Sequence, residues 1–297
     1  MTEVVGLDIG FGHTKVFSDE GAFKFPSWIA YLSKSALSEA ESVSIGSETM
    51  VVGEDAKYEP RKIEISNITA LIKYAPFFMK YVIQKLGKEP QLVISGLPPI
   101  YKDKREDYKK ALESVFKGKA EVVVQGMGIL KDVEDKLGQD ALIIDIGFNT
   151  VDYLLVVRSG EKWKYRKGNT IEEYGVLRAV EAFRENIPDD LGYVRNLSLS
   201  RLIDVFEKGE ITIQGVRRNL QDIKELARRE YTNTLLSRLS TELGNALYEV
   251  ETIAIAGGGA NLIEPQLIEH SNVIIPEKPE FSNVRGYYKI GKEIVGE

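Results

Sequence analysis

The tetrapeptide Asp-Ile-Gly-Phe occurs twice in this chain, as residues 8–11 and as residues 145–148. Each copy follows a run of aliphatic residues and precedes a threonine and a further β-type segment. This pattern predicts a β-hairpin with a glycine turn in each half of the chain, the second turn being one residue shorter than the first. Such an internal repeat favours a fold built from two related halves.

Phosphate binding is the chemistry to which such a turn is suited. Glycine has no Cβ, so backbone N–H groups can come close to phosphate oxygens. The predicted contacts are Gly10, Phe11, Gly12, His13, Thr14 and Lys15 in the first turn and Gly147, Phe148, Asn149 and Thr150 in the second. Asp8 and Asp145 are expected to hold Mg²⁺ through water, because this ion keeps much of its hydration shell. Two facing turns would clamp one nucleotide between them. The alternative is that a glycine after a strand marks an ordinary turn. For His13, the alternative is a surface position without a function.

The composition excludes several classes of protein. The chain has no cysteine, which excludes disulfides, thiolate zinc sites, iron–sulfur clusters and a cysteine nucleophile. Its net charge of -6 argues against direct binding of nucleic acid, so any link to DNA is expected to run through a partner protein. No apolar run approaches the roughly 20 residues that cross a bilayer, and the start Met1-Thr2-Glu3 lacks the features of a signal peptide. We therefore expect no membrane contact and a cytoplasmic location.

Strand-type and helix-type segments alternate along the chain, which predicts an α/β fold. The expected strands are 4–8, 14–18, 22–25, 91–95, 120–125, 141–146, 151–158, 161–167 and 252–256, and the expected helices are 68–86, 102–116, 175–186, 200–208, about 216–248 and 284–294. A length of 297 residues favours two domains. We assign residues 1–147 plus 284–297 to domain I and residues 148–283 to domain II, with a cleft at their junction.

A third glycine-rich segment follows the two hairpins. The strand-type residues 253–256 run directly into Gly257, Gly258 and Gly259, and Asn261 follows. In this order and spacing, the three segments make the chain resemble the actin-like ATPase superfamily, which includes sugar kinases and heat-shock chaperones. The resemblance implies a two-domain, duplicated ribonuclease-H-like fold with an interdomain nucleotide cleft. It assigns the glycine triplet and Asn261 to the purine and ribose.

Within this superfamily the chain is most similar to ParM-type plasmid-segregation actins and their archaeal relatives, through residues 25–27, 52–56, 95–99 and 283–287. The resemblance implies that Lys224 and Glu225 contact adenine and ribose, although a solvated pair of helical charges is the alternative. It also implies that Gln125, 20 residues before Asp145, orients the attacking water, although Gln125 can simply end a strand. A glutamine here implies slow hydrolysis.

Gly175 opens a predicted helix, so the first N–H groups of that helix are candidates to face a phosphate. An ordinary helix start is the alternative. The expected catalytic residues are Gln125, Asp145 and Asp8, and the implied cofactors are ATP or ADP and Mg²⁺, with GTP as an alternative to ATP.

The main functional hypothesis is a slow, Mg-dependent ATPase that assembles head to tail into filaments. Plasmid or DNA segregation through an adaptor protein, or another cytoskeletal role, would follow from the resemblance. The first alternative is a small-molecule kinase of the same superfamily, although the chain lacks the cysteine-rich motif found in many sugar kinases and offers no evident catalytic base. The second is a nonpolymerising regulatory relative. The absence of cysteine excludes an iron–sulfur activase.

Overall fold

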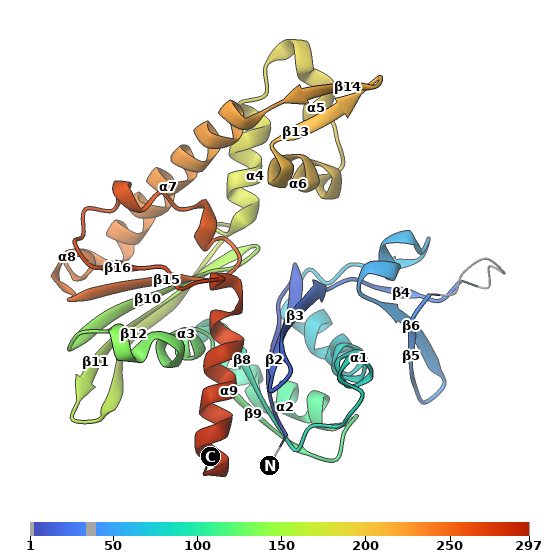
Figure 1. The fold of residues 1–297 in the computed structure, drawn as a ribbon, viewed down its shortest axis with the longest axis vertical. Coiled ribbons are helices and arrows are strands. Elements are labelled where there is room, and N and C mark those ends of the chain that lie inside the picture. Colours follow the sequence, from blue (N-terminus) through green and yellow to red (C-terminus); the bar gives the residue numbers. More distant parts are fainter. Residues whose placement is uncertain (1–2, 34–39, 297) are drawn as a thin grey trace.

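Two mixed β-sheets form the centre of the molecule, one for each copy of the repeated motif (Figure 1). The computed structural model describes residues 3–33 and 40–296. The first sheet has the strand order β3-β2-β1-β8-β9 and the second has the order β12-β11-β10-β15-β16. The first sheet comprises β1 (Val4–Ile9), β2 (His13–Ser18), β3 (Gly21–Pro26), β8 (Leu92–Leu97) and β9 (Lys119–Val124). The second comprises β10 (Asp140–Ile146), β11 (Thr150–Ser159), β12 (Lys162–Glu172), β15 (Thr252–Ala256) and β16 (Val273–Ile274).

The two sheets have the same topology, which confirms the duplicated α/β fold. In each sheet a central strand pairs antiparallel with the strand that follows it and parallel with a distant strand on its other side. The central strands are mainly apolar and almost entirely buried, because both of their faces are covered. We call the first sheet and the elements packed on it the first lobe, and the second sheet and its elements the second lobe.

Helices cover the sheets. In the first lobe α1 (Ile68–Leu86) and α2 (Arg105–Glu113) pack on the first sheet, and in the second lobe α4 (Val176–Glu185) and α7 (Gln221–Leu243) pack together over the second sheet. Helix α1 occupies its predicted range. At the start of this helix the Asn67 side chain accepts a hydrogen bond from the Ala70 N–H. The helix ends at Gly87, which has a φ of 67°.

Each lobe carries a small extension beyond its main sheet (Figure 1). The first lobe carries a sheet of order β5-β6-β4-β7, which the sequence analysis did not predict. Its elements are β4 (Ile29–Tyr31), β5 (Ser42–Ile45), β6 (Glu48–Val52), η1 (Glu54–Tyr58) and β7 (Lys62–Ile63). The second lobe carries η4 (Asp189–Leu191), α5 (Gly192–Arg195), α6 (Leu199–Lys208), β13 (Glu210–Ile213) and β14 (Val216–Asn219).

Several predicted boundaries were wrong. The long helix begins at Gln221 rather than near residue 216, because Gln214 and Gly215 have positive φ values of 47° and 79° and turn the chain into a hairpin of β13 and β14. The helix predicted at 102–116 is split into η2 (Pro99–Lys104) and α2. Strand β12 continues to Glu172, beyond the predicted end at residue 167.

The assignment of residues up to 147 to domain I needs a correction. Strand β10 pairs with β11 and β15, so the segment from Asp140 belongs to the second lobe. Its parallel partner β15 is more than 100 residues away in the chain, and no local pattern indicated that pairing. The outermost residues of the assigned domain I, 1–2 and 297, lie outside the described residues.

The final helix α9 (Ser282–Val295) lies between the two sheets (Figure 1). Its Val284 and Tyr287 pack against Val4, Leu92 and Ile94 of the first sheet. Its other side packs on α3 (Met127–Val133), which in turn packs on β10 and β15. Short elements complete the described chain: η3 (Glu134–Lys136), α8 (Ala246–Glu249), η5 (Ala260–Leu262), η6 (Pro265–Leu267) and η7 (Pro279–Phe281).

Among the described residues, no helix combines the length and the apolar character that crossing a bilayer requires.

Candidate active site

A cavity of about 220 Å³ lies between the two lobes, and both glycine turns line it. The predicted site residues that line it are Asp8, Gly10, Phe11, Gly12, His13, Lys15, Gln125, Asp145, Gly147, Phe148, Asn149, Thr150, Gly258 and Asn261. A Cβ built on Gly12 would lie 3.0 Å from ring carbons of Phe148, so the tips of the two turns lie close together. The structure therefore brings the two repeated turns to opposite walls of one cleft.

The two turns have the same length, which corrects the prediction that the second is one residue shorter. The Gly10 N–H donates to the His13 carbonyl at 3.2 Å, and the Gly147 N–H donates to the Thr150 carbonyl at 2.9 Å. The equivalent of Thr150 is therefore His13 rather than Thr14. Thr14 is fully buried and does not line the cavity, and its hydroxyl forms a 2.9 Å hydrogen bond with that of Ser27.

Asp8 and Lys15 form an ion pair at the cleft wall. They are directly opposite each other in the pairing of β1 with β2, and the Lys15 Nζ lies 2.9 Å from an Asp8 carboxylate oxygen. Burial by itself lowers the pKa of Lys15, but the charge and hydrogen bond of Asp8, followed by the charges of Asp145 and Glu280, outweigh burial and raise it. Lys15 is therefore a fixed positive charge in the cleft.

Asp145 has a different environment, although it stands at the equivalent position of the second hairpin. Its directly opposite partner on β11 is Asp152, not a lysine. Burial and the charge of Asp8 raise the pKa of Asp145 to about 6, against the opposing effects of Lys15 and of hydrogen bonds from Asn283 and Gln125. The pKa of Asp152, also buried, is raised well above its usual value by burial and by Asp145.

Gln125, the residue predicted to orient water, lies at the end of a strand and lines the cavity. It directly follows β9, and its backbone N–H donates to the Leu97 carbonyl at 2.8 Å. Its side chain lines the cavity together with Asp145 and acts to lower the pKa of that carboxyl.

His13 lies at the rim of the cleft with an exposed side chain. Desolvation by the surrounding walls and the positive charges of Lys24 and Lys15 lower the pKa of His13 to about 4. The ring is therefore neutral at pH 7 and retains one N–H donor.

The glycine triplet is divided between the cavity and the wall behind it. Gly258 and Asn261 line the cavity. Gly257 has a φ of 90°, and a Cβ built on it would lie 2.3 Å from an Asp145 carboxylate oxygen. A Cβ on Gly259 would lie 2.3 Å from the Ile146 side chain. Gly257 and Gly259 thus allow this loop to approach the second hairpin closely.

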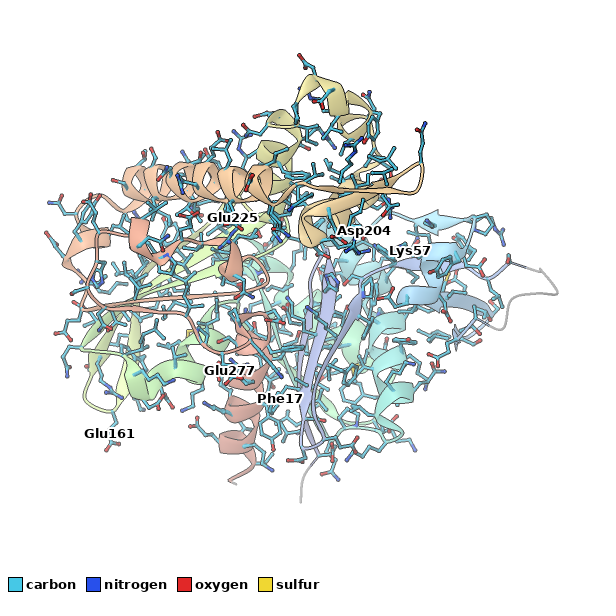
Figure 2. All side chains as sticks on the ribbon, turned by 45° about the horizontal axis from the view of Figure 1, so that its top comes forward. Phe17, Lys57, Glu161, Asp204, Glu225 and Glu277 are labelled. Carbon is cyan, nitrogen blue, oxygen red and sulfur yellow. The ribbon has the colours of Figure 1, made fainter. Side chains whose placement is uncertain are left out.

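Gly175, Lys224 and Glu225 do not line the cavity. The N–H groups of Gly175, Val176 and Leu177 donate to carbonyls of the second turn, so the start of α4 holds that turn in place instead of presenting these donors to a ligand. The Lys224 Nζ donates to the Glu207 carbonyl at 2.8 Å. The exposed Glu225 carboxylate pairs with Arg228 at 2.9 Å on α7 (Figure 2).

The cavity also has lining residues that were not among the predicted site residues. They are Ile9, Lys24, Ile68, Leu71, Gly96, Leu97, Pro98, Tyr101, Val176, Ile203, Glu207 and Glu280. The Lys24 Nζ on β3 lies 3.6 Å from the Glu280 Oε1 on η7. Ile203 and Glu207 both belong to α6. Apart from Ile9 and residues 96–98, which lie in segments already singled out, no local sequence signal marked these residues, because they meet only after the lobes have folded.

The carboxylates of the cleft suit a Mg²⁺ ion bound through water better than a metal ion bound by protein atoms alone. Among the described residues, no group of three or more His, Cys, Asp or Glu side chains gathers as a metal site. Asp8 and Asp145 are two buried carboxylates whose charges repel each other. A hydrated divalent cation bound to phosphate oxygens needs only one or two carboxylates of this kind.

Two family models match the chain. The model of actin like proteins, N-terminal domain, matches residues 6–134, and that of the archaeal actin homologue MreB-like, C-terminal, matches residues 143–269. No curated protein matches the chain in sequence.

Solved structures with the same fold are numerous. The native structure of Ta0583, an archaeal actin homologue, is 18% identical with a TM-score of 0.80, and the match covers 98% of this chain and 100% of that one. Its complex with ADP is 17% identical with a TM-score of 0.73, covering 98% and 100%. A 15-stranded ParM filament from Clostridium botulinum is 18% identical with a TM-score of 0.76, covering 98% and 99%. Models of actin homologues match both lobes of the chain, and the solved structures share its fold over almost its whole length. The chain therefore belongs to the actin-like superfamily.

Proposed function

We propose that this protein is an actin-like ATPase that binds a Mg²⁺-nucleotide between its lobes and assembles head to tail into filaments. The observation that carries the proposal is the pair of matched glycine turns on opposite walls of one cleft, each beside a buried aspartate. The turn backbones would bind phosphate oxygens, and Lys15 and the neutral His13 would add donors from the first lobe. Gly258 and Asn261 would face the nucleoside.

Hydrolysis would depend mainly on positioning and charge, because phosphoryl transfer needs little covalent chemistry from the protein. Gln125 would orient the attacking water, and Asp8 and Asp145 would hold the hydrated Mg²⁺. The metal would neutralise charge on the phosphates. An adenine nucleotide is supported by the ADP complex of Ta0583, and GTP is the competitor to test.

Filament assembly is supported by the fold shared with the Clostridium botulinum ParM filament. A nucleotide that touches both lobes binds the closed form better than the open form, and thus shifts the population toward closure. Head-to-tail contacts between closed copies extend without forming a ring. A role in DNA segregation through an adaptor, and a cytoplasmic location, remain predictions.

The proposal is tested by phosphate release, sedimentation after addition of ATP or GTP, and negative-stain images. Asp145→Ala is expected to lower phosphate release by at least about 100-fold while the circular dichroism spectrum stays unchanged, because the variant loses one of the two metal-holding carboxylates. Asp107→Ala, on the exposed face of α2, is the matched control and should hydrolyse at the wild-type rate.

Wild-type turnover by Asp145→Ala would remove this residue from the site. Absence of filaments at every nucleotide and salt concentration, together with phosphorylation of a sugar, would favour the kinase alternative.

A further inference from the structure

Asn283 is a buried polar residue that the proposed chemistry does not use. It lies in the first turn of α9, where this helix passes between the lobes, and its side chain is 4% exposed. A buried amide needs partners for its donor and for its acceptor, since an unpaired polar group inside a protein is costly. The hydrogen-bond partners of Asn283 connect it to residues of the cleft.

The Asn283 side chain bridges two groups of the site. Its Nδ2 donates to Oδ2 of Asp145 at 2.6 Å, and its Oδ1 accepts from the backbone N–H of Gly126 at 3.2 Å. A carboxylate only accepts and a backbone N–H only donates, so these two partners determine which way the amide faces. Gly126 directly follows Gln125, whose side chain lines the cavity together with Asp145. Asn283 therefore connects Asp145 to the backbone next to Gln125.

Helix α9, which carries Asn283, is held in place on two sides. The Ser282 hydroxyl donates to Asp132 of α3 at 2.7 Å, and Arg285 donates to the same carboxylate at 3.0 Å. On the opposite side, a Cβ built on Gly6 of β1 would lie 2.1 Å from the Val284 carbonyl, so α9 is pressed against the first sheet. Asn283 therefore links a carboxylate of the second lobe to a helix held by both lobes.

We infer that Asn283 is a positioning residue, which holds Asp145 and the backbone after Gln125 in the mutual arrangement that hydrolysis requires. An amide suits this task because it donates and accepts at once, which neither a carboxylate nor an apolar side chain can do. The inference rests on the proposed function, since it presumes that Gln125 and Asp145 act on a nucleotide.

The test compares Asn283→Asp with Ser282→Ala. Asn283→Asp keeps an acceptor for Gly126 but replaces the amide donor to Asp145 with a second carboxyl, whose charge or shared proton disturbs Asp145. We therefore expect kcat to fall at least about 10-fold while the Kd for ADP changes less than about threefold. Ser282→Ala also removes one buried hydrogen bond of α9, but one that leads away from the cleft to Asp132. It should keep kcat within about twofold of wild type.

A second variant covers the case in which a buried carboxylate prevents folding. Asn283→Leu has a similar size and removes both hydrogen bonds, so it should lower kcat in the same way. Hydrogen exchange at the Gly126 amide gives a readout that is independent of turnover. It should quicken in Asn283→Leu and stay slow in Asn283→Asp, because only the aspartate still accepts from this N–H.

The outcomes separate the two proposals. If the wild-type protein binds no nucleotide, the proposed function is wrong and the role of Asn283 falls with it. If the wild-type protein hydrolyses ATP and the Asn283 variants do so equally fast, only the inference about Asn283 is wrong. A loss of kcat that matches the loss of melting temperature in Asn283 and Ser282 variants alike would reduce Asn283 to a structural role.

Discussion

The ionised carboxylate of Asp145 destabilises the folded protein above mildly acidic pH. Burial and the charge of Asp8 raise its pKa from the ordinary 3.8 to about 6. The folded protein therefore binds this proton more tightly than the unfolded chain does. The resulting stabilisation is complete below about pH 4 and is lost as the pH rises through 6. In the proposed function this charge would help to hold the hydrated Mg²⁺, which gives a reason for the unfavourable arrangement to persist.

Asp145→Asn is expected to stabilise the nucleotide-free protein at neutral pH. The variant lacks the ionisation that destabilises the wild type, so its melting temperature should exceed that of the wild type above pH 6, by a free energy on the order of 2 kcal/mol. The difference should disappear near pH 4, where the carboxyl of the wild type is protonated. Thermal unfolding across pH 4–8 measures it.

Asp107→Asn, which alters an exposed carboxylate, is the control and should show no such difference. A gain in Asp145→Asn that stays constant down to pH 4 would contradict the explanation.

At the scale of elements, the contact between α3 and α9 depends on glycine. A Cβ built on Gly286 of α9 would lie 1.7 Å from the Gly128 carbonyl of α3. No side chain can occupy that space, so the two helices touch through their backbones. This close contact positions the start of α9, and with it Asn283, beneath the cleft.

Gly286→Ala should therefore destabilise the protein by roughly 2–4 kcal/mol, because the helices must move apart. Urea unfolding measures the change. Gly192→Ala is the control, since this helical glycine has no atom within 4 Å of the added Cβ. It should be neutral or stabilising by up to about 1 kcal/mol. Equal effects of the two substitutions would show that helix propensity, and not the contact, decides the outcome.

At the scale of the whole molecule, the lobes also meet through charged side chains beside the cleft. Lys57 of η1 and Asp204 of α6 belong to opposite lobes, and their Nζ and Oδ2 atoms lie 3.9 Å apart (Figure 2). Helix α6 also carries the cavity residues Ile203 and Glu207. If the lobes close around a nucleotide as proposed, we expect a change in this pair to act on that closure.

Lys57→Glu should weaken nucleotide binding about two- to threefold at low salt, because like charges then oppose closure. The effect should shrink in about 1 M salt, where exposed charges are screened. Calorimetric titration with ADP measures it. The charge-swapped pair Lys57→Glu with Asp204→Lys should restore binding, and Lys110→Glu on α2, another exposed lysine, should leave binding unchanged. A salt-independent loss would refute this account.

The sequence by itself determined the parts of the protein that local chemistry controls. The repeated Asp-Ile-Gly-Phe predicted two hairpins and a duplicated α/β fold, since glycine, aliphatic runs and alternation act within a few residues of each other. The same reasoning placed Asp8, Gly10, Lys15 and Asp145 at the cleft, and the family resemblance added Gln125. The structure brings all five residues together there.

Only the tertiary structure decided how residues far apart in the chain meet. Thr14 looked equivalent to Thr150, but the pairing of the strands makes His13 its counterpart and buries Thr14. Asn283 reaches Asp145 across 138 residues, and Glu280 and Lys24 join the cleft from opposite ends of the chain. Such contacts depend on strand register and on the packing of α9 between the lobes, and those are set by burial summed over the whole molecule rather than by any local pattern.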